Sequence, residues 1–240
     1  MLSDITMKPV IIGIGGAHSN AGKTTCASLL LENLDGWGAI KYSKTDLYSS
    51  ITDDPDILGE DNKDTKRFLD AGALRVLWVK SPVNELKDVL PMAVERLSAL
   101  SGIIVEGNSA IEFLRPDIII FIFGRQPERL KKGAKDILSK ADAVVSEYLS
   151  RAEKNPGFPP GAGLFGKSPE DDVKLVSYIK GMIDIKKKIS SMIKNSSADG
   201  KITCPLARKI AKEANVPLKE VGRAADKLGI KITDCELGCF

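Results

Sequence analysis

The sequence has little histidine, few cysteines and no long apolar run. His18 is the one histidine, and four cysteines occur among 240 residues. No apolar stretch reaches the roughly 18 residues that a membrane span needs, and the first residues lack the basic, apolar and small-residue order of a signal peptide. We therefore expect a cytoplasmic protein without a membrane partner, whose cysteines are reduced unless they bind something.

The charge is close to balanced as well. The formal net charge of +3 is too small to imply a polyanionic partner for the whole chain. Residues 181–240 nevertheless carry 12 Lys or Arg against 7 Asp or Glu, whereas residues 1–180 carry 23 against 25. Hydrophobic residues make up 43%, so a chain of this length can bury a core.

Short apolar runs alternate with helical patterns through residues 10–145. The runs lack period-two alternation, which is typical of parallel strands buried on both faces. We therefore predict an α/β fold, a mostly parallel sheet with helices on both faces. Residues 48–62 are interpreted as a mobile loop, and residues 155–167 as a Pro/Gly-rich break. The predicted strands are 10–14, 39–42, 74–79, 103–105, 117–123 and 143–145, and the predicted helices are 23–34, 63–71, 83–100, 127–140 and 169–194.

A glycine-rich turn between the first predicted strand and helix has the pattern of a phosphate loop. Residues 13–25 read GIGGAHSNAGKTT, with an alanine where the strict pattern has its first glycine. Glycines let backbone N–H groups turn toward phosphates, and the helix N-terminus adds partial positive charge. Lys23 would contact the β- and γ-phosphates, and Thr24 would bind Mg²⁺. This predicts a P-loop NTPase fold. The residues predicted to line the loop are Ala17, His18, Ser19, Asn20, Ala21, Gly22, Lys23, Thr24 and Thr25.

Acidic residues near the ends of other predicted strands are candidates to complete the site. Glu106 ends the apolar run at 103–105, where a Mg²⁺-holding carboxylate is expected. Asp46 follows the second predicted strand. Lys23, Glu106 and Asp46 are the predicted catalytic residues, and Thr24, Asp46 and Glu106 the predicted Mg²⁺ ligands. Asp64 could equally be a helix cap, and His18 is interpreted as a loop residue rather than a general base.

Several segments together resemble one family. GKTT at 22–25, Ile40-Lys41, KDTKR at 63–67 followed by AGA at 71–73, and VEG at 105–107 are similar in order to the molybdopterin-guanine dinucleotide biosynthesis protein B family. The resemblance covers residues 8–148. It implies a GTP-binding, weakly hydrolysing accessory protein and homodimer that supports a guanylyltransferase joining GMP to molybdopterin. It also implies that Lys41, Asp64 and Arg67 face the nucleotide or the molybdopterin partner.

Two other functions remain open at this stage. The loop lead-in Ser19-Asn20-Ala21 is similar to that of dethiobiotin synthetase, which would mean an ATP-dependent ligase. No Asn-Lys-x-Asp guanine pattern is present, so GTP is implied by the resemblance alone. A nucleotide-gated regulatory protein that acts through its C-terminal tail is the third possibility.

The chain is predicted to have three parts. Residues 1–154 form the nucleotide-binding domain, 155–200 a linker with a connecting helix, and 201–240 a small unit resembling a helix-turn-helix, with helices at 205–213 and 218–228. Packing is favoured over nucleic-acid binding for this helix pair. Cys204, Cys235 and Cys239 all fall in the last part, which raises zinc or an iron–sulfur cluster as a speculative site. Cys26 is interpreted as a core residue.

Overall fold

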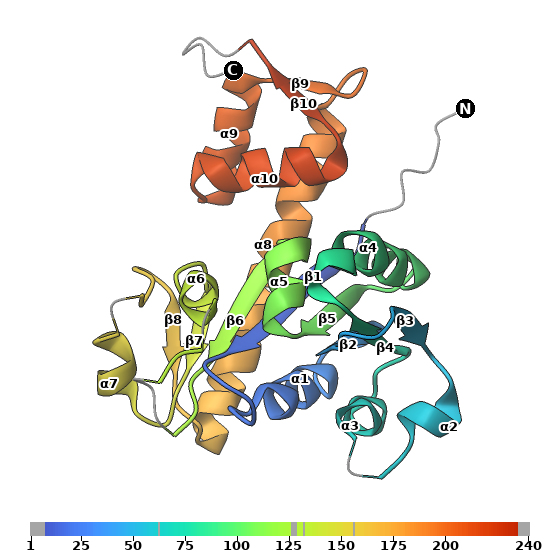
Figure 1. The fold of residues 1–240 in the computed structure, drawn as a ribbon. Coiled ribbons are helices and arrows are strands. Elements are labelled where there is room, and N and C mark those ends of the chain that lie inside the picture. The colour runs from blue at the N-terminus through green and yellow to red at the C-terminus, as the bar shows by residue number, and fades with distance from the viewer. Residues whose placement is uncertain (1–7, 62, 126–128, 132, 156, 235–240) are drawn as a thin grey trace. The chain divides into compact units, whose positions relative to one another are not determined.

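The computed structural model describes residues 8–234 except 62, 126–128, 132 and 156 (Figure 1). Strands and helices alternate through the first two thirds of the chain, as predicted. The strands are β1 (Val10–Gly16), β2 (Trp37–Lys44), β3 (Ser50–Thr52), β4 (Val76–Ser81), β5 (Gly102–Glu106), β6 (Ile118–Ile122), β7 (Ala143–Val145), β8 (Gly163–Phe165), β9 (Lys201–Thr203) and β10 (Lys231–Thr233). The helices are α1 (Lys23–Leu31), α2 (Pro55–Leu58), α3 (Asp64–Asp70), the 3₁₀ turn η1 (Val83–Glu85), α4 (Leu86–Arg96), α5 (Asn108–Leu114), α6 (Ala134–Leu138), α7 (Leu149–Glu153), α8 (Pro169–Ser196), α9 (Cys204–Ala214) and α10 (Leu218–Leu228).

The main sheet has eight strands in the order β3-β4-β2-β5-β1-β6-β7-β8. All neighbours are parallel except β3, which runs antiparallel to β4 at one edge. β1 lies between β5 and β6, with Ile14 beside Glu106 and Gly16 beside Ile122. The residues that follow β1 therefore emerge at the same edge of the sheet as Glu106.

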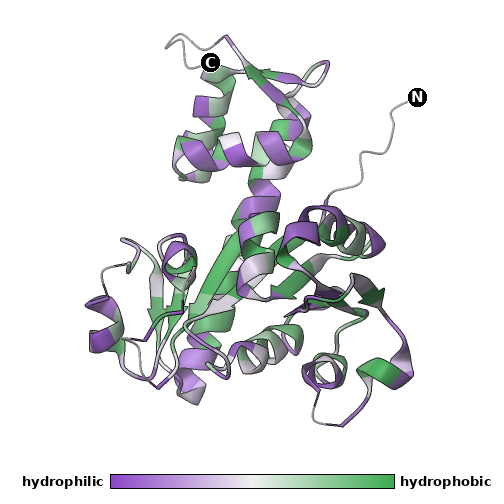
Figure 2. Ribbon diagram, viewed as in Figure 1, coloured by the Kyte–Doolittle hydropathy of each residue, from purple (hydrophilic) through white to green (hydrophobic). Residues whose placement is uncertain are grey.

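Helices cover both faces of this sheet. Helices α4, α5 and α6 pack on one face and α1 and α3 on the other (Figure 1). The central strands are mostly hydrophobic (Figure 2), and every residue of β1, β5 and β6 is buried, including Glu106 at the end of β5. The lack of period-two alternation in the sequence is thus explained by burial on both faces.

Two segments that were expected to lack regular structure contain some. The segment predicted as a mobile loop holds β3 and α2, and Asn62 at its end lies outside the described residues. Helix α2 begins at Pro55, and the Asp54 carboxylate caps it by accepting from the Asp56 N–H at 3.0 Å. The Pro/Gly-rich break holds β8, an edge strand of three residues. Strands this short leave little periodicity in the sequence.

The helix predicted at 127–140 is shorter than expected. Helix α6 spans only Ala134–Leu138, and Gly133 before it has a positive φ of 83°. Residues 126–128 and 132 lie outside the described part of the chain. The segment leading into α6 instead returns toward β1, because the Lys131 N–H donates to the Ala17 carbonyl at 3.0 Å.

The chain divides into two compact units, Met1–Tyr178 and Ile179–Phe240. The second unit contains the C-terminal part of α8, the helices α9 and α10 and the parallel pair β9-β10. Its core is formed by apolar residues of α8, α9 and α10, together with Ile202 in β9 and Ile230 directly before β10. Helix α10 begins after Pro217 and ends at Gly229, with a φ of 70°, so both predicted tail helices are confirmed. The two short strands were not predicted.

No helix among the described residues is long and apolar enough to cross a bilayer.

Candidate functional site

The loop between β1 and α1 turns its backbone toward the carboxyl edge of the sheet. Asn20 and Gly22 have φ values of 60° and 105°, a left-handed conformation that glycine adopts at little cost. The Asn108 side chain fixes the start of the loop. Its Oδ1 accepts from the Gly16 N–H and its Nδ2 donates to the Gly16 carbonyl, both at 3.0 Å. We call residues 17–25 the cradle.

Lys23 lies across the cradle. Its Nζ donates to the His18 carbonyl at 3.1 Å, so the side chain folds back over the loop. Burial lowers the pKa of Lys23, opposed by the charge of Glu106 and assisted by Lys41. A bound anion would relieve this penalty, because it offers the ammonium group an opposite charge in a partly dehydrated site.

The side chains of four residues, each on a different element, meet at one place: Thr24, Lys41, Asp64 and Glu106. The Thr24 Oγ1 donates to Glu106 Oε2 at 2.9 Å, from α1 to the end of β5. The Lys41 Nζ lies 2.6 Å from Glu106 Oε1 and 2.5 Å from Asp64 Oδ2. Lys41 is on β2, and Asp64 begins α3. The structure therefore brings together Lys23, Thr24, Lys41, Asp64 and Glu106, which were predicted from distant parts of the sequence.

The two carboxylates of this group differ in exposure. Glu106 is 2% exposed, and it is paired with Lys41 and Thr24. Asp64 is half exposed, and partial burial alone would raise its pKa. The hydrogen bond and charge of Lys41, with smaller effects of Thr24 and Arg67, outweigh burial and lower the pKa of Asp64. Asp64 is thus held as a carboxylate at neutral pH.

Arg67 reaches the far end of the cradle, whereas Asp46 does not reach the group. The Arg67 Nη2 donates to Thr25 Oγ1 at 3.0 Å. Asp46 pairs with Lys44 at 3.7 Å, and its side chain is 87% exposed. Its predicted roles as catalytic residue and Mg²⁺ ligand have no support in this arrangement, and Asp64 stands beside Lys41 and Thr24 instead. The reason is that β2 runs on to Lys44, which carries Asp46 beyond the edge where Glu106 ends β5.

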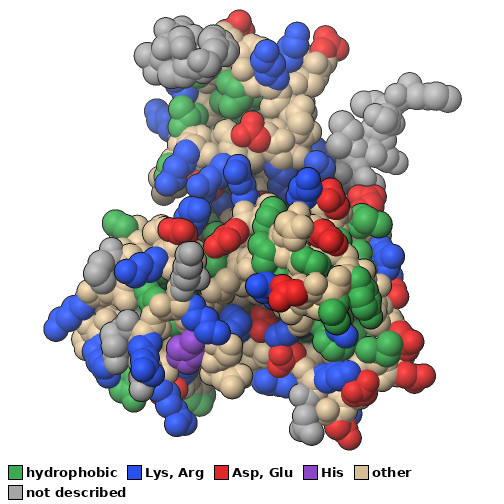
Figure 3. Space-filling view, viewed as in Figure 1, with side chains coloured by type: hydrophobic (Ala, Val, Ile, Leu, Met, Phe, Trp, Pro, Cys, Tyr) green, Lys and Arg blue, Asp and Glu red, His purple; other side chains and the backbone are tan. Residues whose placement is uncertain are grey.

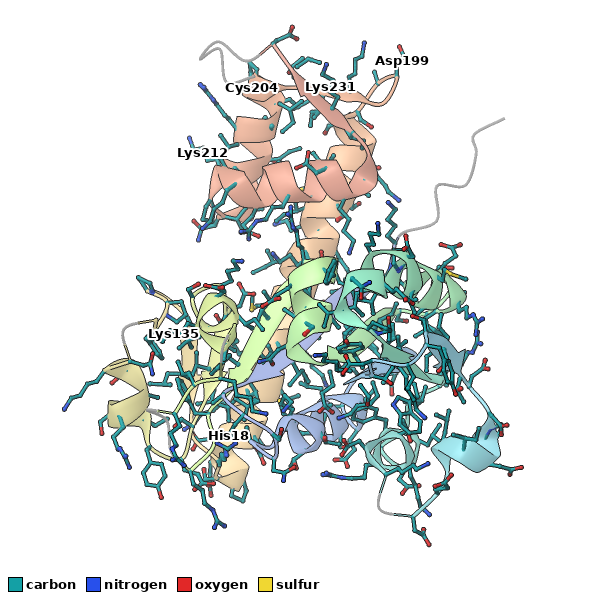
Figure 4. All side chains as sticks on the ribbon, viewed as in Figure 1. His18, Lys135, Asp199, Cys204, Lys212 and Lys231 are labelled. Atoms are coloured by element: carbon teal, nitrogen blue, oxygen red, sulfur yellow. The ribbon has the colours of Figure 1, made fainter. Side chains whose placement is uncertain are left out.

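His18 lies at the outer side of the cradle (Figure 4). Its Nδ1 contacts the Ser19 carbonyl at 2.6 Å, and its ring packs directly over Gly124, where a Cβ would overlap it. Lys and Arg side chains gather around the histidine in the space-filling view (Figure 3). The Lys131 Nζ donates to the Oγ of Ser19, the residue next to His18, at 2.9 Å. This supports the interpretation of His18 as a loop residue in a basic surrounding.

Sequence reasoning missed four residues of this edge. Asn108 braces the cradle, and Lys131 contacts it from the segment after β6. Lys167 follows β8, and its Nζ lies 3.4 Å from both the Ala21 carbonyl and Glu147 Oε1. Glu147 itself follows β7. All four come after the ends of parallel strands, so the carboxyl-edge rule could have found them if β8 had been recognised.

The predicted cysteine site has no support in the described residues. Cys204 is buried at the start of α9, while Cys235 and Cys239 lie outside the described part of the chain (Figure 4). Among the residues that the structure describes, no three His, Cys, Asp or Glu side chains are grouped to hold a metal ion. Cys26 is buried in the core, as predicted, and burial raises the pKa of its thiol to about 12.

Comparisons with known proteins bear on the fold. No protein-family model and no curated protein sequence matches this chain. It is similar in structure to HypB from Helicobacter pylori in complex with nickel, with a TM-score of 0.50 and 13% identity over 74% of this chain and 88% of that one. The hydrogenase maturation factor HypB from Archaeoglobus fulgidus has the same TM-score and identity, over 73% and 90%.

The fold is that of a P-loop NTPase. The cradle follows a buried strand and leads into helix α1, which is the position of a phosphate loop in such a fold, and the fold class predicted from residues 13–25 is confirmed. At this level of identity the similarity shows the fold alone. The substrate and the partner have to be inferred from the residues of the site.

Proposed function

We propose that this protein binds a nucleoside triphosphate with Mg²⁺ in the cradle and hydrolyses it slowly. The observation that carries the proposal is the meeting of Lys23, Thr24 and Glu106 at one edge, with Thr24 Oγ1 2.9 Å from Glu106 Oε2. Backbone N–H groups at the start of α1 would bind the phosphates, and Lys23 would leave the His18 carbonyl to contact the β- and γ-phosphates.

The residues around Thr24 fit Mg²⁺. This ion prefers hard oxygen ligands and keeps several of its waters, so one hydroxyl and one or two carboxylates suffice. Thr24, Glu106 and Asp64 supply these groups within one hydrogen-bonded cluster. When bound, the ion would shield the negative charge of the phosphates, and Lys41 would then be free to turn from the carboxylates toward the γ-phosphate.

We expect slow hydrolysis because neither Asp64 nor Glu106 is arranged to act as a general base. A general base works best when its pKa lies near the working pH. Lys41 lowers the pKa of Asp64, and Glu106 is already paired with Lys41 and Thr24. Both groups are therefore suited to hold a cation or water, and the lowered pKa makes Asp64 poorly suited to take a proton. A protein of this kind acts through its nucleotide-bound state.

The more specific role that we propose is that of a GTP-binding accessory protein in molybdenum cofactor maturation. The stretch 63–73 carries the resemblance, and its Asp64 and Arg67 contact Lys41 and Thr25 at the cradle. One structure of similar fold is described as a hydrogenase maturation factor. In this role a homodimer would present the nucleotide to a guanylyltransferase that joins GMP to molybdopterin.

Calorimetric titration with Mg²⁺-GTP and Mg²⁺-ATP tests the binding proposal. The variant Lys23→Ala should lose about 100-fold in affinity, because hydrogen bonds to charged groups contribute about 1.5–3 kcal/mol each. Lys87→Ala, an exposed lysine on α4, is the matched control and should bind like the unmodified protein. Equal affinity of the Lys23 variant and the unmodified protein would refute the site. Tighter binding of ATP would favour the ligase alternative.

The accessory role requires a separate assay. Purified guanylyltransferase should convert molybdopterin and GTP to the dinucleotide faster when this protein is added, and Lys23→Ala should remove the effect. If the rate is unchanged by the unmodified protein, the molybdenum role is wrong while nucleotide binding stands.

A further inference from the structure

Glu147 and Lys167 stand on the side of the cradle opposite to the Mg²⁺-binding group. The Lys167 Nζ lies 3.4 Å from the Ala21 carbonyl and 3.4 Å from Glu147 Oε1. The ammonium group of Lys167 thus bridges the Glu147 carboxylate and the cradle. Exposed ion pairs contribute little to stability, so the importance of this pair for a ligand depends on where it lies relative to the cradle.

The positions of the strands define which end of a nucleotide faces this pair. The sheet order around the cradle is β2-β5-β1-β6-β7-β8. The residues that would hold Mg²⁺ and the γ-phosphate, Glu106, Lys41 and Asp64, come from β5, β2 and α3 on one side of β1. The nucleoside must therefore leave the cradle toward the other side, where Glu147 follows β7 and Lys167 follows β8.

The backbone around Glu147 is held in place. The Ser146 N–H donates to the Phe165 carbonyl at 3.0 Å, and Ser146 Oγ, on a fully buried side chain, accepts from the Tyr148 N–H at 3.1 Å. Residues on both sides of Glu147 are thus anchored, while its own side chain is 42% exposed. A pre-positioned, accessible carboxylate of this kind suits recognition of a ligand.

A carboxylate distinguishes purine bases by their hydrogen-bond donors. An ionised carboxylate only accepts hydrogen bonds, through two oxygens. Guanine presents two donors side by side, the N1–H and the N2 amino group, and so matches both oxygens. Adenine presents the acceptor N1 at that edge and would face the carboxylate with a lone pair. A site that pairs buried or fixed polar groups with a ligand rejects analogues lacking the partner.

We propose that Glu147 selects guanine nucleotides by accepting from the N1–H and N2 amino group of the base, and that Lys167 is the positioning residue between base and cradle. This inference rests on the proposed nucleotide binding. It assigns a residue to the guanine preference, in a chain without the Asn-Lys-x-Asp pattern. Charge-assisted bonds of this type should be worth about tenfold or more in affinity each.

Titration of the full chain with GDP, IDP, ADP and XDP, each with Mg²⁺, tests the assignment. IDP lacks the N2 amino group, and XDP carries a carbonyl there. The unmodified protein should bind GDP about tenfold more tightly than IDP, and more tightly than ADP and XDP. In Glu147→Gln one carboxylate oxygen is replaced by an amide NH₂ group. The remaining oxygen can accept from the N1–H of xanthine, and the NH₂ group can donate to its C2 carbonyl. That variant should lose GDP affinity and gain XDP affinity, which loss of structure would not produce.

Three further variants complete the design. Glu147→Ala should abolish the difference between GDP and IDP. Glu153→Gln, an exposed glutamate on α7, is the matched control and should keep the full GDP preference. Lys167→Ala should weaken binding of all four nucleotides and reduce the GDP-to-IDP ratio.

The outcomes separate this inference from the proposed function. If the unmodified protein binds GDP, IDP and ADP equally and Lys23→Ala loses them all, nucleotide binding stands and the role of Glu147 is wrong. If Glu147→Gln weakens GDP and IDP by the same factor without gaining XDP, the carboxylate does not contact the base, and the assignment is again wrong. If no nucleotide binds the unmodified protein, the proposed function itself fails.

Discussion

At the residue scale, Lys41 balances the negative charges of two carboxylates beside the cradle. Lys41 is the shared partner of Asp64 and Glu106, which approach from α3 and β5. Without Lys41, two carboxylates and the Thr24 hydroxyl would face each other around an uncompensated negative charge. The same arrangement explains why a divalent cation fits there, because Mg²⁺ would take over the role of the ammonium group.

At the residue scale, Gly102 should tolerate no side chain. It pairs with Trp37 across β5 and β2, and a Cβ at this position would overlap the indole ring, which is only 3% exposed. Gly102→Ala should lower the free energy of unfolding by about 1–3 kcal/mol, measured by urea denaturation.

A glycine with free space around it provides the control for this prediction. Gly181 lies within α8, and nothing lies within 4 Å of a Cβ built there. Gly181→Ala should be neutral or stabilising by up to about 1 kcal/mol, because alanine favours helix. A Gly102 variant as stable as this control would contradict the packing argument. Adding Trp37→Leu should remove most of the penalty of Gly102→Ala.

At the scale of elements, an ion pair within the C-terminal unit joins α8 to α10. The Lys186 Nζ lies 2.5 Å from Glu220 Oε2, and both side chains are largely buried. Partial burial acts to raise the pKa of Glu220, but the hydrogen bond and charge of Lys186 outweigh it and lower this pKa. The pair lies beside the apolar core of the unit, so it orients the two helices on that core.

This ion pair should make the C-terminal unit acid-sensitive. A carboxyl group whose pKa is lower in the folded than in the unfolded state stabilises the fold above the unfolded pKa of about 4.3. The contribution of Glu220 is lost as the pH falls through its folded pKa. Lys186→Met should therefore destabilise the unit by about 1–3 kcal/mol at pH 7, and by progressively less as the pH falls below the unfolded pKa of about 4.3, in denaturation followed by circular dichroism.

The control for the ion pair is an exposed carboxylate of the same unit. Glu213 pairs with Lys209 at 3.8 Å on the surface of α9. Glu213→Gln should change stability by less than about 1 kcal/mol at any pH, since exposed pairs contribute little. A pH-independent effect of Lys186→Met would show that only its packing matters.

For the whole molecule, the proposed nucleotide site and the C-terminal core belong to different units of the chain. All residues of the proposed site lie within Met1–Tyr178, and the core built on α8, α9 and α10 lies within Ile179–Phe240. Each unit has its own apolar clusters. Helix α8 has buried residues in both units, Leu175 and Val176 in the first and Ile189 and Ile193 in the second. Ligand binding stabilises the part of a protein that forms the site.

Hydrogen–deuterium exchange should therefore show a local response to nucleotide. At about 100 times the dissociation constant, Mg²⁺-GTP should add about 2.7 kcal/mol to the stability of the unit that binds it. Peptides from β1, β5 and α1 should gain protection, and peptides from α9 and α10 should not. Equal protection of both sets would mean that the two units unfold as one.

Much of the sheet could be predicted from the sequence because its central strands are buried on both faces. β1 and β6 form unbroken apolar runs, β5 is apolar up to Glu106 at its end, and the cradle carries its own pattern of glycines and Lys-Thr-Thr. The short strands β3, β8, β9 and β10 were not predicted, because three residues are too few for a period to emerge. They form because their neighbours offer unpaired backbone groups, which the sequence does not show. β7 is equally short but consists of Ala-Val-Val, all buried, and its apolar run was predicted at 143–145.

The residues of the cradle and the type of fold were determined by the sequence itself, since glycine positions, a lysine and a buried strand act locally. The tertiary structure decided which distant residues join them. Asp46 and Asp64 look alike as sequence candidates, but only Asp64 reaches Lys41, because α3 returns to the sheet edge after β2 has passed it. The tertiary structure also brings Glu147 and Lys167 to the cradle. The reason is that β7 and β8 run parallel to β1 in the same sheet, so their carboxyl ends lie at the same edge.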